Sequence, residues 1–161
     1  YVFFRFFPKL KIGSIIVFQD YFYHWSATLI AAVQLLKKLN IISFEFSKAS
    51  SLCVKVLKIP TSDDLLFVDN EMENNNTIIE LLDNSINNIN DYPIDRAGMF
   101  VHRLYLAKIQ FLWENNDFDK ATFILSSIFK NNKNLSQNFI DDYFELMNYG
   151  FSIRALYDID H

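Results

Sequence analysis

Asp20 is the residue whose position in the sequence most suggests chemistry. It directly follows a predicted strand, Ile15 to Gln19, whose residues Ile15 to Phe18 are all apolar and which Gly13 and Ser14 precede. Such a run is typical of a strand that is covered on both faces, and a glycine suits the tight turn that leads into it. In open α/β sheets, ligands bind beyond the carboxyl ends of the strands. We therefore expect the Asp20 carboxylate to lie at an edge of the sheet where a ligand could bind.

Three more candidates lie in the aromatic segment that follows, Tyr21 to Trp25. This segment has no clear period, and we interpret it as a loop at the same edge of the sheet. Tyr23, His24 and Trp25 are the candidate substrate-binding residues, with Tyr23 and Trp25 as a pocket wall and His24 as a general base. Each has a structural alternative: the three side chains could simply pack, and Asp20 could cap a helix or loop.

A helix and two strands must position these residues. Apolar spacing and terminal lysines predict an amphipathic helix over Ala27 to Leu39. Strands are predicted over Ile41 to Phe46 and over Leu52 to Ile59, and the short turn between them makes them an antiparallel pair. Residues 1–60 are therefore expected to form an α/β unit.

The segment from Pro8 to Tyr21, PKLKIGSIIVFQDY, and the order of elements as far as residue 60 resemble a known family. They are similar to the last third of class I S-adenosylmethionine-dependent methyltransferases, especially the macrocin-type O-methyltransferases. In that family a glycine turn leads into a fifth strand that ends in an acidic residue. A helix and an antiparallel pair, the sixth and seventh strands, then complete a Rossmann-like sheet.

The resemblance implies transfer of a methyl group from S-adenosylmethionine to a hydroxyl of a small molecule or a sugar. It implies that Asp20 is catalytic, helping to hold and deprotonate that hydroxyl, and that Asp20 binds a divalent metal such as magnesium. Tyr21 stands where the related catechol-type enzymes have an asparagine ligand, which a tyrosine cannot replace. The family's cofactor elements, a glycine-rich turn after a first strand and an acid after a second, are not in this sequence. We therefore expect the chain alone to lack the cofactor-binding half and to be inactive.

The resemblance also implies an open sheet edge. In the family's strand order the fifth strand lies between the fourth and the seventh, and this sequence offers no fourth strand. The strand over Ile15 to Gln19 would then expose one backbone edge and an apolar face. We expect self-association through this edge.

The second part of the sequence has a different character. Residues 61–76 are acidic and polar and are predicted to be a linker, and residues 77–161 are predicted to be an all-helical tail. Within the tail, Leu106 to Leu125 resembles one tetratricopeptide-type helical hairpin, with Ala107 and Ala121 where its helices approach. A helical bundle is the alternative. The alternative function is a non-catalytic module in which the helical tail binds a protein partner.

Composition restricts the classes of partner and compartment. The 161 residues are 51% hydrophobic, with a formal net charge of −4 and a pI near 5.3, which argues against nucleic-acid binding. No segment reaches the roughly 18 apolar residues of a membrane span. Cys53 is the only cysteine, so neither a disulfide framework nor a cysteine zinc site is expected. We expect a cytoplasmic protein that acts on a small-molecule substrate.

Overall fold

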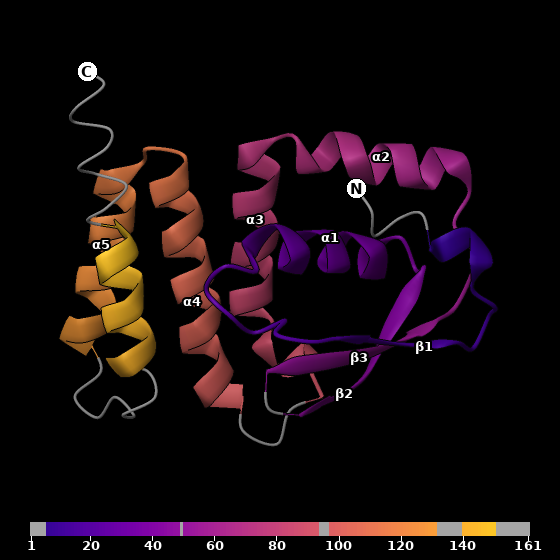
Figure 1. Ribbon diagram of the computed structural model, residues 1–161, viewed down its shortest axis with the longest axis horizontal. Helices are drawn as coiled ribbons and strands as arrows, with labels where there is room; N and C mark the ends of the chain where they lie inside the picture. Colours follow the sequence, from indigo (N-terminus) through magenta and orange to yellow (C-terminus); the bar gives the residue numbers. More distant parts are fainter. Residues whose placement is uncertain (1–5, 49, 94–96, 132–139, 151–161) are drawn as a thin grey trace.

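The computed structural model describes residues 6–48, 50–93, 97–131 and 140–150. This part of the chain is a mixed α/β structure, in which a three-stranded antiparallel sheet is followed mainly by helices (Figure 1). The elements, in chain order, are η2 (Phe7–Lys9), β1 (Ile15–Phe18), α1 (Ala27–Lys38), β2 (Ile42–Lys48), β3 (Ser51–Val56), α2 (Ser62–Met72), α3 (Asn75–Asn87), η3 (Ile89–Asp91), α4 (Ala97–Glu114) and α5 (Phe118–Asn131). A further helix covers residues 140–150.

The sheet has the order β1-β3-β2, and β3 is antiparallel to both neighbours. β1 and β2 are consequently parallel to each other, and α1 makes the crossover between them. Gly13 has a φ of +88° in the turn before β1, a conformation in which a side chain would be strained. Its backbone N–H donates to the Val56 carbonyl, which ties the turn to the end of β3. The predicted strand, helix and antiparallel strand pair are all present.

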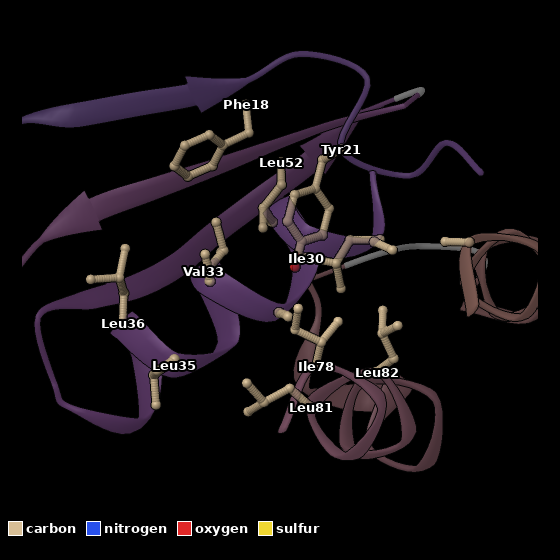
Figure 2. Close-up of a cluster of buried hydrophobic side chains, with 14 of the residues drawn as sticks. Phe18, Tyr21, Ile30, Val33, Leu35, Leu36, Leu52, Ile78, Leu81 and Leu82 are labelled. Carbon is tan, nitrogen blue, oxygen red and sulfur yellow. The ribbon is translucent and has the colours of Figure 1, made fainter. Parts of the chain in front are cut away.

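The two faces of the sheet have different environments. Phe18 of β1 and Leu52 of β3 are buried opposite each other and belong to the main hydrophobic core. Figure 2 shows the buried side chains of α1 between this face of the sheet and Ile78, Leu81 and Leu82 of α3.

The other face, which carries Ile15, Val17 and Phe46, leaves each of these side chains more than half exposed. The prediction that β1 is covered on both faces therefore does not hold within the described residues.

Residues 61–76, the predicted linker, instead contain α2. The Thr61 hydroxyl accepts the Asp64 backbone N–H, and the Asp64 carboxylate accepts the Thr61 backbone N–H, which together form a capping box. Val68 and Met72 are buried in the main core. This segment is therefore part of the packed fold rather than a linker, because its apolar residues have helical spacing despite the many acidic side chains between them.

α4 is the central element of the helical part. Leu104, Ala107 and Phe111 on one face belong to the main core, whereas Leu106 and Ile109 on another face belong to a second core. A helix that is apolar on opposite faces is expected to be enclosed, and α4 indeed lies between α3 and α5 in Figure 1. The predicted hairpin is thus the pair α4 and α5.

The second core also contains Ala121 and Leu146. Ala121 therefore packs in this core, but Ala107 faces the main core instead.

The helix over residues 140–150 closes this second core. Gly150 approaches the Trp113 indole so closely that an added Cβ would lie 2.5 Å from the ring. Glycine here permits close packing between helices. None of the helices in the described part of the chain combines the length and apolarity that crossing a bilayer requires.

Candidate functional site

Asp20 lies in the turn directly after β1, with its carboxylate at the surface. Its φ of +54° is a left-handed conformation, which aspartate tolerates better than most residues. The Ser26 hydroxyl donates to its carbonyl oxygen over 2.7 Å, and the Ser50 hydroxyl donates to its carboxylate over 3.0 Å. Ser26 is the residue before α1, but its hydroxyl makes no cap for that helix. The turn is thereby held between the start of α1 and the β2–β3 connection.

Among the described residues, Asp20 has few neighbours that could join it as ligands of a divalent metal ion. Magnesium takes six oxygen ligands, usually one or two carboxylates together with waters or substrate oxygens. Among the described residues, no group of three or more His, Cys, Asp or Glu side chains could hold a metal. The neighbouring Tyr21 side chain is fully buried, whereas Asp20 is exposed, so Tyr21 adds no ligand beside the Asp20 carboxylate. The predicted metal role of Asp20 therefore gains no support from its neighbours.

Tyr21 and Phe22 anchor the aromatic loop in the main core. The Tyr21 and Tyr92 hydroxyls are hydrogen-bonded over 2.9 Å, and the Gln34 amide of α1 donates to the Tyr92 hydroxyl over 2.6 Å. Burial, together with the Tyr92 hydroxyl, raises the pKa of Tyr21 well above its ordinary value. Burial also raises the pKa of Tyr92. These tyrosines are therefore neutral structural groups.

His24 is also buried, with 6% of its surface exposed. Its Nδ1 lies 2.5 Å from Oε1 of Gln110 on α4, and its Nε2 lies 3.8 Å from Oε2 of Glu145 on the helix over residues 140–150. Gln110 in turn donates through Nε2 to Glu114 over 2.9 Å. In this structure, His24 thus joins the loop to the helical part.

Tyr23 and Trp25 lie on either side of His24 in the sequence and stack on each other, with ring centroids 4.4 Å apart. The Arg103 guanidinium of α4 lies 5.2 Å from the centre of the Tyr23 ring, and its Nε donates to Asp142 over 3.3 Å. Trp25 is about half exposed, at 52%. The structure brings Tyr23, His24 and Trp25 together, with Trp25 the most accessible of the three.

Sequence reasoning missed several partners of these candidates. Gln110 lies 86 positions from His24, and Tyr92 lies 71 positions from Tyr21. Gln110 did carry a signal, since it is a polar residue within the strongly apolar helix α4. A polar side chain in such a place usually has a buried partner.

A hollow of about 570 Å³ lies along β1 and has a mainly apolar lining. It is lined by Phe6, Phe7, Leu10, Leu29 and residues 15–19. Within the described part of the chain, β1 pairs with β3 alone, so its other backbone edge has no partner strand there. This agrees with the expected open edge.

The chain was also compared with known proteins. Comparisons with protein families, with curated proteins and with solved structures find no significant match.

Proposed function

We propose that the sheet and α1 are the C-terminal part of an S-adenosylmethionine-dependent methyltransferase domain. The observation that carries this proposal is the strand order β1-β3-β2, with β3 antiparallel to both neighbours. The family resemblance implies a seventh strand beside the fifth and an antiparallel sixth and seventh pair. If β1, β2 and β3 are the fifth, sixth and seventh strands, the observed order meets both conditions.

The open side of the sheet supports the same proposal. β1 has no second partner strand among the described residues, and Ile15 and Val17 are exposed on the face away from α1. A strand of four apolar residues suits burial on both faces and pairing on both edges. The fourth strand of a methyltransferase sheet would supply the missing pairing.

Asp20 is the proposed contact to the methyl acceptor. Its carboxylate lies at the surface, just beyond the carboxyl end of β1, and Ser50 and Ser26 fix the turn that carries it. In this role Asp20 holds an acceptor hydroxyl through a hydrogen bond and takes up its proton. The exposed Trp25 is the proposed part of the substrate wall. The family's glycine-rich turn and second-strand acid are not in this sequence, so the role that we propose for this chain concerns the acceptor.

Calorimetry tests the proposal directly. The product of the whole reading frame that contains this chain is titrated with S-adenosylmethionine, beside the 161-residue chain alone. We expect binding by the whole product and none by the chain alone. Failure of the whole product to bind would contradict the proposal.

A variant then tests the role of Asp20 in the product of the whole reading frame. Asp20→Asn is expected to lower kcat for methyl transfer by about 10² to 10⁴, the usual contribution of a positioned base. Ser43→Ala, an exposed hydroxyl of β2 that bonds Glu45, is the matched control and should leave kcat unchanged.

The second candidate function, a protein-binding helical module, is favoured by one observation. A hollow of about 570 Å³ lies between α3, α4 and α5, and Phe123, which lines it, is 74% exposed. Exposed apolar surface of this kind often marks an interaction site. Under this alternative, the whole reading frame encodes no cofactor-binding half and its product does not bind S-adenosylmethionine.

A further inference from the structure

His24 connects three segments that lie far apart in the sequence. The aromatic loop carries His24 itself, α4 carries Gln110, and the helix over residues 140–150 carries Glu145. His24 and Gln110 are both 6% exposed, so their contact is shielded from water. Any change in the protonation of His24 therefore acts where these segments meet.

The hydrogen-bond chain fixes which nitrogen of the neutral ring carries the proton. The Glu114 carboxylate can only accept, so the Gln110 amide nitrogen must face it, and the 2.9 Å contact has this arrangement. The Gln110 carbonyl oxygen then faces His24 and also only accepts. Nδ1 of His24 must therefore be the donor in the 2.5 Å contact, which leaves Nε2 as the unprotonated nitrogen of the neutral imidazole.

Nε2 is consequently mismatched while the ring is neutral. It is buried and has no hydrogen-bond partner, although the Glu145 carboxylate oxygen lies 3.8 Å away. Two acceptors that face each other cannot form a hydrogen bond. A proton on Nε2 turns it into a donor directed at a carboxylate, and the buried nitrogen is then satisfied.

We propose that His24 is a pH-sensitive latch that holds the helix over residues 140–150 against the aromatic loop when it is protonated. The latch closes when acid protonates the ring and weakens when the ring is neutral. The charged groups around the latch are mainly acidic. Glu114 lies behind Gln110, and Asp142 and Asp141 lie about one helical turn from Glu145. Arg103, the nearby cation over Tyr23, is paired with Asp142.

Amide hydrogen exchange of the intact chain, measured by mass spectrometry at pH 5.5 and pH 7.5, tests the latch. After correction for the intrinsic exchange rates, protection of residues 140–150 should be about fivefold higher at pH 5.5. This is the size expected for a charged hydrogen bond to a carboxylate that is largely exposed. Equal protection at the two pH values would overturn the proposal.

Two variants separate His24 from other titrating groups. Glu145→Gln keeps the side-chain shape, and its amide can donate to the neutral Nε2, so protection should become high and independent of pH. Because the Glu145 side chain is 64% exposed, this variant should not impair folding. His102→Gln, on α4, should keep the full pH dependence. The latch would be contradicted if the protection of residues 140–150 still depended on pH in Glu145→Gln. It would also be contradicted if that dependence disappeared in His102→Gln. The test does not depend on the proposed function.

Discussion

The paired hydroxyls of Tyr21 and Tyr92 allow a prediction in which two similar substitutions have unequal effects. Tyr92→Phe removes the only hydrogen-bond partner that the structure gives the fully buried Tyr21 hydroxyl. An unsatisfied buried hydroxyl costs about 1–3 kcal/mol, so we expect a loss of about 2 kcal/mol in the free energy of unfolding. Tyr21→Phe leaves Tyr92 bonded to Gln34, so its loss should be about 1 kcal/mol.

Urea denaturation at pH 7, followed by circular dichroism, measures both losses. The double variant removes both hydroxyls and leaves no unsatisfied group at Tyr21. Its loss should therefore be smaller than the sum of the single losses by at least about 0.5 kcal/mol. Equal losses for the single variants, or strict additivity in the double variant, would mean that the two hydroxyls are not paired in this way.

The same pair sets a pH dependence. Because the pKa values of Tyr21 and Tyr92 are raised in the folded state, their neutral forms favour folding. This contribution is fully present below about pH 10, the unfolded value, and is lost as the pH rises through the folded values. Alkaline unfolding curves should show this loss, and the double Phe variant should lack it. A double variant that unfolds with the wild-type pH dependence would contradict the assignment.

Three other features of the structure give further predictions. Thr61→Ala removes the capping box of α2 and should lower the free energy of unfolding by about 1 kcal/mol in urea, whereas the exposed neighbour Ser62→Ala should have little effect. The Thr61 backbone N–H lowers the pKa of Asp64, so the stabilisation by Asp64 is present above pH 3.8 and is lost as the pH falls through the lowered value. Asp64→Asn should reduce this fall in the free energy of unfolding at acidic pH. Gly150→Ala places a methyl group against the Trp113 ring and should cost about 1–3 kcal/mol, with a shift in tryptophan fluorescence. Unchanged stability and fluorescence would mean that the helices pack less closely there. Val17→Lys should reduce self-association of the chain in light scattering at tens of micromolar, whereas Leu66→Lys, an exposed leucine on α2, should not. A monomeric wild-type chain would contradict the open-edge prediction.

Local sequence pattern was sufficient to predict most of the helices and strands of residues 1–60. The apolar run after Gly13 is β1, and the predicted helix over Ala27 to Leu39 differs from α1 by one residue at its end. The predicted strand pair corresponds to β2 and β3, although β3 ends at Val56 rather than Ile59. These elements have apolar periodicities that are visible within a few residues.

α2 was wrongly predicted to be a linker, although the sequence contains the signals of a helix. The acidic residues of this segment suggested a linker, but Thr61 and Asp64 have the spacing of a capping box, and Leu65, Val68 and Met72 recur at helical intervals. Five acidic side chains can be accommodated because they lie on the helix around that apolar stripe, or beside its ends.

The surroundings of the candidate site could not be predicted in the same way. Tyr21 meets Tyr92, and His24 meets Gln110, only because α3 and α4 fold back over α1 and the aromatic loop. These contacts depend on how whole helices pack, which no local spacing encodes. Asp20 lies where its position in the sequence predicted, in the turn at the end of β1, whereas its roles toward a substrate and a metal stay predictions.

Our proposal that this chain completes a methyltransferase sheet can be tested directly by reading the nucleotide sequence upstream of the Tyr1 codon in the source genome. We expect a continuous reading frame that encodes a strand, a glycine-rich turn and, after a second strand, an acidic residue. A start codon close to Tyr1, or an unrelated upstream domain, would contradict it and would make the helical part the place to look for function.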